Sequence, residues 1–466
     1  MRLGTRARRA ALGCCWVALA VAGSTTHPAS ATPEVEDVPL PQGMVEAVRR
    51  DLGIDAYEYL RRAETAQRLA AFATTARIAH RAAFAGIRMD GDRPVVSLTD
   101  DVNASDARAA AEEAGFTVET VTDSEVTLHG RGVAFERWLA GQSSSVTDAV
   151  IGYGIDVVTN SLAVRLAKDL QLPVEAGQVR TLLAVMPEAR PDDAPVGGMA
   201  IADAEPAADF IGGQPYGIEL AGKTYMCSFG FNGTDAEGHT VNVTAGHCDP
   251  NTLVDPASKT PQPQRIFDIH DSEHGVELGY FGDSSFSPHD YSILRINEPV
   301  AARFQNNLVS TAPAPDAQAA GTDSDAELPT GSSGGRWLGV DAEREVLRID
   351  GTAEPIVGDS VCKSGFKSGY SCGTVIAVGQ RSLLRGAPGH DEQGIPVENM
   401  FYVNLCAQRG DSGGPIFAGT KAVGINSAIV THQTPLDGNC GHLPVLLGQP
   451  ISTVLMDNPG LTIRTS

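Results

Sequence analysis

The residues whose types and spacing could do chemistry are centred on Ser412, in the run Gly410-Asp411-Ser412-Gly413-Gly414-Pro415. A serine with an acid before it and glycines close by can lie on a tight turn that exposes its hydroxyl and lets a carbonyl carbon come close. The N–H groups of Gly410 and Ser412 could then donate to an oxyanion, and each such donor lowers a barrier by about 3–4 kcal/mol. The run therefore indicates a nucleophile, although the same residues also fit an ordinary turn.

A candidate base and a candidate acid precede Ser412. His247 follows an apolar strand, and its neighbour Cys248 could hold it in place. Asp290 begins the strand predicted at 291–296, and an acid at the start of a buried strand has to be paired or hydrogen-bonded. Facing His247, it would fix the imidazole tautomer and stabilise the imidazolium. A lone histidine is usually structural, so the prediction of acyl transfer depends on all three residues.

The order of the three residues separates two kinds of serine hydrolase. The run around Ser412 also fits the G-x-S-x-G turn of α/β-hydrolases, in which the serine precedes the acid and the histidine. His432 and His442 do follow Ser412, so order alone leaves that fold open. Only 54 residues (466 − 412) follow Ser412, however, and they show little helical pattern. That is too little chain for the remaining βα units, so the order His247, Asp290, Ser412 is favoured.

The net charge limits the possible binding partners, and the N-terminal residues indicate the compartment of the protein. The chain has 466 residues and a formal charge of −22, which argues against nucleic acid or an anionic membrane as a partner. Arg6, Arg8 and Arg9 precede the apolar stretch 10–22, and Ala29-Ser30-Ala31 fits a cleavage site, so residues 1–31 are expected to be a signal peptide. We expect a secreted, monomeric protein. Cys14 and Cys15 would be lost with the signal peptide. The other six cysteines all lie from Cys227 onwards and predict disulfides there.

The two halves of the chain differ in pattern. Residues 32–186 indicate an α+β region, with helical spacing from Met44 to Leu52 and a cap at Asp55 that opens a second helix. Further expected elements are strands at 94–98, 116–119, 155–159 and 162–166 and a helix at 105–114. Residues 187–209, rich in Pro, Asp and Ala, predict an exposed linker. From residue 210 to 466 short alternating segments predict an antiparallel sandwich or barrel, with a surface insertion at 304–336.

From about Ile211 the chain resembles the chymotrypsin-fold serine proteases of the secreted bacterial branch, which includes α-lytic protease and the streptogrisins. The matching motifs are 244–248, 290–294, 361–365 with 369–374, and 406–415. The resemblance implies a serine endopeptidase acting on polypeptides, an all-β fold of two six-stranded antiparallel barrels, and an active site between them. It also implies three disulfides, which are Cys227–Cys248, Cys362–Cys372 and Cys406–Cys440.

The first half also resembles the pro-regions of that branch, through residues 57–60 and 156–160. The resemblance implies that residues 32–186 form an α+β pro-domain that assists folding of the protease at 210–466. It would then inhibit the enzyme until cleavage in the 187–209 linker, near Asp209–Ile211. Assisted folding suits a β protein with many non-local strand pairings, which form slowly.

The resemblance gives two further sets of residues a role. In that branch a basic residue after the first cysteine of the second pair usually pairs with the acid before the serine, so Lys363 is expected to form a buried ion pair with Asp411. Relatives typically carry Ser-Gly-Gly in the strand where this chain has Ser427-Ala428-Ile429, so Ile429 should shorten the substrate pocket. We expect small or medium apolar side chains there, in a pocket formed by Val403, Asn404, Leu405, Ser427, Ala428 and Ile429.

Two alternative functions and one alternative site stay open. A secreted binding protein could keep the fold without turnover, and an esterase could use the same nucleophile. His270 and His274 beside Asp271 have the spacing of metal ligands, but such residues in a polar loop are more often solvated. We therefore expect neither a metal nor a cofactor.

Overall fold

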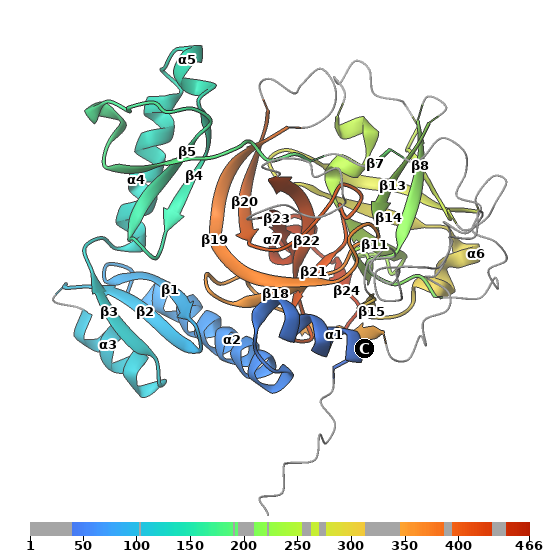
Figure 1. The fold of residues 1–466 in the computed structure, drawn as a ribbon, viewed down its shortest axis with the longest axis horizontal. Coiled ribbons are helices and arrows are strands. Elements are labelled where there is room, and N and C mark those ends of the chain that lie inside the picture. Colours follow the sequence, from blue (N-terminus) through green and yellow to red (C-terminus); the bar gives the residue numbers. More distant parts are fainter. Residues whose placement is uncertain are drawn as a thin grey trace, which may run out of the picture. The chain divides into compact units, whose positions relative to one another are not determined.

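The computed structural model describes residues 40–101, 104–189, 192–193, 209–220, 223–253, 262–269, 276–312, 345–385, 394–430 and 444–466. The expected signal peptide, most of the expected linker, the residues from His270 to His274, and Cys440 lie outside these ranges. The described chain is mostly β-structure arranged in several sheets (Figure 1). In the ranges searched, no helix has the length and apolar character needed to cross a membrane.

The first described segments alternate helices with a small sheet. After α1 (Gln42–Ala47) and the π-helical turn η1 (Val48–Leu52) comes α2 (Ala56–Ala79). The predicted cap is confirmed, because the Asp55 side chain accepts a hydrogen bond from the Glu58 N–H at 2.8 Å. A three-stranded sheet follows in the order β1-β2-β3. Its elements are β1 (Phe84–Asp90), β2 (Arg93–Thr99), α3 (Ala104–Glu113) and β3 (Thr117–Val121).

The next segments correct two details of the sequence analysis. Helix α4 (Glu125–Leu139), capped by Ser124, was not expected. The strand expected at 155–159 is β4 (Val150–Asp156), which ends earlier because Asp156 Oδ1 accepts from the N–H groups of Val158 and Thr159 and so forms a turn. The hairpin continues in β5 (Ser161–Leu166), and β6 (Val179–Leu183) lies parallel to β5.

The start of the expected linker is not exposed. Pro187 and Ala189 are buried, and Glu188 pairs antiparallel with Ile429. The prediction was wrong at these residues because their backbone groups find partners that lie far along the chain. Glu188 bonds to Ile429, while the Ala189 N–H donates to the Arg385 carbonyl at 2.9 Å.

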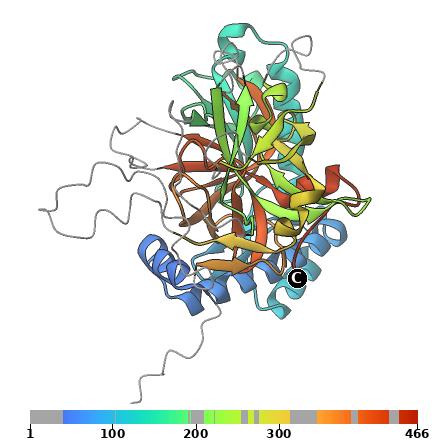
Figure 2. The ribbon, with the colours of Figure 1, turned by 90° about the vertical axis from the view of Figure 1, so that its right-hand side faces the viewer.

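A nine-stranded sheet contains most strands between residues 215 and 296. Its order is β24-β10-β11-β14-β13-β12-β8-β9-β7, and Figure 2 shows its green and yellow strands after a 90° turn. Its core includes Tyr216, Phe229 and Leu294. The strands are β7 (Asp192–Asp193), β8 (Pro215–Leu220), β9 (Lys223–Ser228), β10 (Phe231–Thr234), β11 (Thr240–Thr244), β12 (Arg265–Phe267), β13 (Glu277–Ser285), β14 (Tyr291–Ile296) and β24 (Thr462–Ile463).

A ten-stranded sheet joins strands from both halves of the chain. Its order is β18-β21-β22-β23-β20-β19-β4-β5-β6, and β17 (Gly351–Thr352) pairs with β22. Strand β4 joins it through the pair Tyr153 and Arg381. The remaining strands are β18 (Ser360–Lys363), β19 (Ser371–Leu384), β20 (Ile395–Val403), β21 (Pro415–Ala418), β22 (Lys421–Val430) and β23 (Val445–Pro450). A division into two barrels of six strands stays a prediction.

Short elements complete the described chain. These include α5 (Ser144–Thr147), α6 (Glu298–Ala301), β15 (Leu308–Ser310), β16 (Val346–Arg348) and α7 (Ile451–Asp457). The expected surface insertion at 304–336 is wrong for its first residues, because Phe304 is fully buried and β15 pairs with β16. The aromatic ring of Phe304 stacks on Phe210 at 4.7 Å, so apolar packing holds the start of this segment in the core despite its polar composition.

Candidate active site

Strand pairing brings His247 and Asp290 together. β11 and β14 run antiparallel with Thr244 opposite Ser292. His247 lies three residues beyond Thr244, and Asp290 lies two residues before Ser292, so both reach the same end of the sheet. The His247 Nδ1 atom is 2.8 Å from Asp290 Oδ2, and the His247 backbone N–H donates to Oδ1 at 2.9 Å. Both side chains are fully buried.

The hydrogen bonds of Asp290 define the state of the imidazole. A carboxylate accepts hydrogen bonds, so Nδ1 is the donor in this contact and Nε2 is the ring nitrogen left for another partner. Within the described ranges, the buried Nε2 of His247 has no hydrogen-bond partner, so the expected hydrogen bond between His247 and the Ser412 hydroxyl is not formed in this structure. A buried, unpartnered nitrogen costs stability, and such costs are common at functional sites. The arrangement holds the ring in one orientation, as a general base requires.

Two residues of the other large sheet support Asp290. The Ser427 hydroxyl, from β22, donates to Asp290 Oδ2 at 2.5 Å, and the Gln449 side chain, from β23, accepts from the Asp290 N–H at 2.9 Å. Sequence reasoning placed Ser427 in the substrate pocket and did not find its bond to Asp290 or the contact of Gln449. Only the packing of the two sheets against one another reveals these contacts.

The loop of Ser412 packs against the end of β11. Gly410 and Gly413 have φ values of +96° and +83°, which favour glycine. A Cβ atom at Gly413 would also collide with Thr244 Oγ1. The Ser412 carbonyl accepts from the Ser228 N–H at 2.8 Å and lies 3.9 Å from Cys248 Sγ, next to His247 along the chain. The loop is thus held close to the candidate base.

Two backbone donors of this loop are left unused. The loop's other groups are engaged, since the Gly410 carbonyl accepts from Ser228 Oγ and the Gly413 N–H donates to the Asn426 carbonyl. No hydrogen bond between described residues uses the N–H of Gly410 or of Ser412. These are the two donors expected to stabilise an oxyanion.

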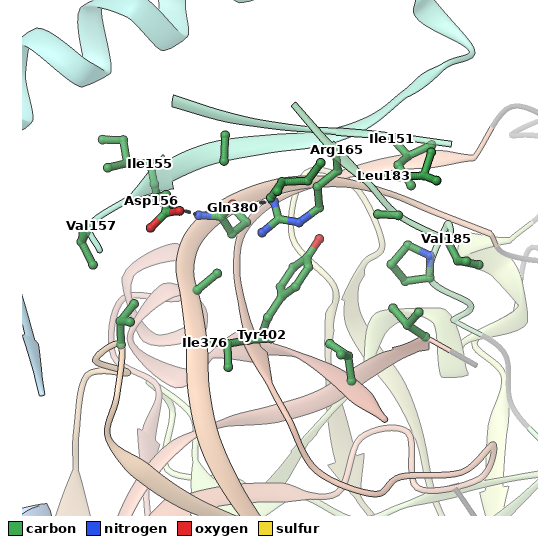
Figure 3. Close-up of a pocket in the computed structure, with 18 residues that line it drawn as sticks. Ile151, Ile155, Asp156, Val157, Arg165, Leu183, Val185, Ile376, Gln380 and Tyr402 are labelled. Carbon is green, nitrogen blue, oxygen red and sulfur yellow. Dashed lines mark hydrogen bonds between the residues drawn. The ribbon is translucent and has the colours of Figure 1, made fainter. Parts of the chain in front are cut away.

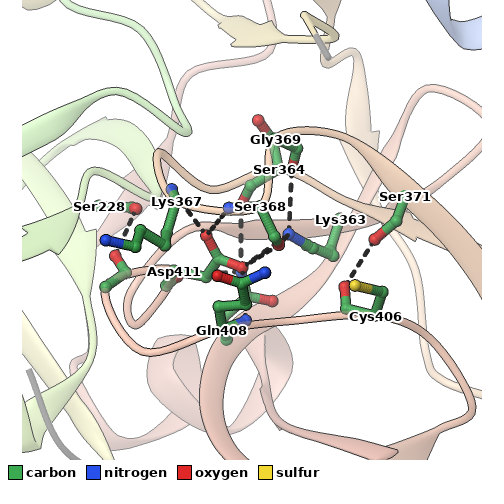
Figure 4. A network of polar contacts seen from close by, with 12 residues as sticks. Ser228, Lys363, Ser364, Lys367, Ser368, Gly369, Ser371, Cys406, Gln408 and Asp411 are labelled. Atoms are coloured by element: carbon green, nitrogen blue, oxygen red, sulfur yellow. Dashed lines mark hydrogen bonds and ion pairs between the residues drawn. The ribbon is translucent and has the colours of Figure 1, made fainter. Parts of the chain in front are cut away.

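Asp411 lies at the centre of a buried polar network (Figure 4). Lys363 Nζ donates to Asp411 Oδ2 at 2.8 Å, and both side chains are almost completely buried. The carboxylate also accepts from the N–H groups of Gln408, Lys367 and Ser368 and from the Ser368 hydroxyl. Burial lowers the pKa of Lys363, while the charge of Asp411 raises it. The network fixes the turn that precedes Ser412.

The residues expected to form the substrate pocket separate into two groups. Ser427 and Ile429 line a small cavity beside Ser412, together with Ala407, Gln408, Arg409 and Glu188. Val403, Leu405 and Ala428 instead belong to hydrophobic cores, and Asn404 is exposed and accepts from the Thr374 N–H. Arg409 and Glu188 were not expected in this cavity.

A larger cavity of about 360 Å³ lies away from Ser412, between strands β4–β6 and strands β19 and β20 (Figure 3). Arg165 donates to Gln380 Oε1 at 2.7 Å there, and its guanidinium lies 4.4 Å from the centre of the Tyr402 ring. Its described lining contains no serine, cysteine or histidine. The cavity therefore offers no nucleophile and base for acyl transfer.

Disulfides anchor both sides of the site. Cys227 is bonded to Cys248, beside His247, and Cys362 is bonded to Cys372, beside Lys363. Cys406 is disulfide-bonded, but its expected partner Cys440 lies outside the described residues. Each closed loop limits the freedom of the unfolded chain and so stabilises the fold by about 2–4 kcal/mol.

Comparisons with known proteins add independent information. The chain is 27% identical over 458 residues to streptogrisin C of Streptomyces griseus, a match that covers 96% of this chain and 81% of that protein. It is 27% identical over 201 residues to serine protease 2 of Streptomyces fradiae, covering 43% and 85%. No family model matches.

Among solved structures, protease A of Thermobifida fusca is 26% identical, with a TM-score of 0.36 over 56% of this chain and 100% of that one. The similarity in sequence to the streptogrisin branch of bacterial serine proteases, expected from the motifs, is confirmed.

Proposed function

We propose that this relative of the streptogrisins is a secreted serine endopeptidase, in which Ser412, His247 and Asp290 form the catalytic triad. The observation that carries the proposal is the pair of hydrogen bonds from His247 to Asp290, which leaves the buried Nε2 free beside the Ser412 loop. One relative, from Streptomyces fradiae, is named serine protease 2.

The reaction proceeds by acyl transfer. Ser412 Oγ attacks the peptide carbonyl carbon while His247 Nε2 takes the hydroxyl proton. The N–H groups of Gly410 and Ser412 bind the oxyanion, and Asp290 stabilises the imidazolium. The C–N bond then breaks as His247 gives its proton to the leaving amine. Water attacks the resulting ester through the same steps, which releases the acid and restores Ser412.

Residues 32–186 act as a pro-region, and residues 187–189 support this part of the proposal. The Glu188 N–H donates to the Ile429 carbonyl at 2.8 Å, and the Ile429 N–H donates to the Glu188 carbonyl at 2.9 Å. An extended chain so bound to β22 covers the strand edge next to Ser412. A polypeptide substrate would need the same edge, so this segment has to leave before substrate binds.

The test is fluorophosphonate labelling and hydrolysis of a short peptide by the protein after it has been expressed as the full chain, cleaved near Asp209–Ile211 and separated from residues 32–186. We expect label on Ser412, located by mass spectrometry, and peptide cleavage that falls by a factor on the order of 10⁴ or more in Ser412→Ala. The matched control is Ser452→Ala, because that hydroxyl lies on α7 and donates to Glu354. Label without any peptide cleavage would favour an esterase, and no label would favour a binding protein.

A further inference from the structure

The cavity beside Ser412 contains one cation, Arg409, and that cation already binds a carboxylate. Arg409 Nη2 donates to Glu188 Oε2 at 2.5 Å. Their side chains are 43% and 21% exposed, so water reaches both groups. Among the described residues, Glu188 is the acid that pairs with Arg409. Arg409 directly precedes Gly410, so its charge lies next to the proposed oxyanion donor.

The backbone of Glu188 shows how a bound chain would run. Glu188 and Ile429 exchange both N–H···O hydrogen bonds and are therefore directly opposite in an antiparallel pair. In that register the residue two positions after the one facing Ile429 comes opposite Ser427. Ser427 bonds to Asp290, so this later position is nearest the catalytic groups. The residue facing Ile429 thus precedes the one that is attacked.

We propose that Arg409 makes the site prefer polypeptides with an acidic side chain two residues before the residue whose carbonyl Ser412 attacks. The inference rests on the proposed function and specifies its substrate class. Backbone hydrogen bonds to Ile429 can form with any residue, so they contribute affinity but no selectivity for the side chain. Arg409 adds selectivity. A carboxylate at this position gains an ion pair with Arg409, a neutral amide gains none, and an ammonium group is repelled.

The size of the preference depends on the exposure of the pair. Ion pairs in contact with water are weak, so Glu should exceed Gln by about two- to five-fold in kcat/KM. Lys at the same position should be poorer than Gln. Salt should reduce the difference between Glu and Lys, because it screens exposed charges over about 8–10 Å. The expected apolar preference at the attacked residue concerns a different side chain and is independent of this one.

The first experiment compares three peptides that differ only at this position, as Glu, Gln or Lys, with the protein cleaved near Asp209–Ile211 and separated from residues 32–186 as enzyme. Arg409→Gln should make the three values of kcat/KM nearly equal, and Arg409→Glu should place Lys above Glu. The matched control is Arg265→Gln, because Arg265 forms its ion pair with Glu277 on the exposed part of β12. That variant should keep the original order of the peptides.

A second experiment needs no peptide turnover and uses the chain's own Glu188. We expect Glu188→Lys to speed labelling of Ser412 by a fluorophosphonate, because repulsion from Arg409 loosens the segment that covers the strand edge. The double variant Glu188→Lys with Arg409→Glu should restore slow labelling, since the pair is re-formed with its charges exchanged.

The outcomes separate the two proposals. If Ser412 takes no label and no peptide is cleaved, the proposed function fails and the preference falls with it. If the protein is labelled and cleaves peptides, but Glu, Gln and Lys give equal kcat/KM, only the role of Arg409 is overturned. Labelling can also occur without measurable cleavage. In that case the role of Arg409 is overturned if the wild type, the Glu188→Lys protein and the double variant are labelled at equal rates.

Discussion

His247 is joined to Asp290 by two hydrogen bonds, one from the ring and one from its own backbone N–H. They measure 2.8 Å to Oδ2 and 2.9 Å to Oδ1. One carboxylate therefore fixes both the imidazole and the short turn that carries it. A ring held in this way needs little reorganisation when it takes up a proton, which is what a general base requires.

Asp290→Asn tests this relationship. An amide can present a donor to Nδ1, which would force the proton to Nε2 and remove the base. We expect kcat to fall by a factor on the order of 10⁴ with the fold retained. Peptide hydrolysis measures the first effect and thermal unfolding the second. Retention of more than a tenth of the wild-type rate in a folded variant would remove Asp290 from the triad.

Ser427→Ala removes the third donor to the Asp290 carboxylate. Hydrogen bonds to charged groups contribute about 1.5–3 kcal/mol, so the free energy of unfolding should fall by that amount, and kcat should fall too. Urea unfolding and peptide hydrolysis measure the two changes. Ser452→Ala is matched to it, because Ser452 also donates to a carboxylate, that of Glu354, but at an exposed site. The control should change stability by less than about 0.5 kcal/mol. Equal effects in both variants would contradict a special role for Ser427.

Lys363→Met tests the ion pair beneath the Ser412 loop. Removing one partner of a buried pair leaves the other charge without compensation, so we expect a loss of about 3–5 kcal/mol in unfolding free energy. Slower labelling of Ser412 should accompany it, because Asp411 adjoins the loop. Lys421→Met is the comparison, since Lys421 lies 2.8 Å from Asp350 at a site where both side chains are exposed. It should cost at most about 1 kcal/mol. A stable, rapidly labelled Lys363→Met protein would show that the network does not support the loop.

The residues that sequence reasoning found are those whose chemistry shows in their type and position. His247 and Asp290 lie at strand ends, and strand pairing then unites them. Ser427 and Gln449 contact Asp290 from 137 and 159 residues away, and no local pattern marks such contacts. Their roles depend on how the two large sheets pack.

Local composition does not predict the structure of two segments. Helix α4 contains Gly130 and Gly132, which weaken the helical pattern by about 1 kcal/mol each, and burial of Leu128 and Phe135 compensates. Residues 187–189 have the composition of a linker, yet Glu188 gains both a strand partner and an ion pair. Composition describes what a segment can do alone and says nothing of a partner surface that another part of the chain provides.

Asp359 predicts an unusual dependence of stability on pH. Its side chain is 2% exposed and accepts a hydrogen bond from the Ser360 N–H at 2.8 Å. Burial raises its pKa from 3.8 to about 8, against the opposing effects of that hydrogen bond and of Arg62 on α2. The unfolded chain releases this proton near pH 4, whereas the folded chain keeps it until about pH 8. Between these values the folded state binds more protons, so its stability falls as pH rises, by at most about 1.4 kcal/mol per unit.

Asp359→Asn should therefore remove a fall in stability between pH 4 and pH 8. The measurement is urea unfolding of both proteins across this range, with the difference between them taken at each pH so that other titrating groups cancel. We expect the variant to gain on the wild type steadily as pH rises, because the amide cannot ionise in its buried site. Glu237→Gln, at an exposed carboxylate, is the control and should give a nearly constant difference. A constant difference for Asp359→Asn as well would mean that water or a structural change relieves the buried charge.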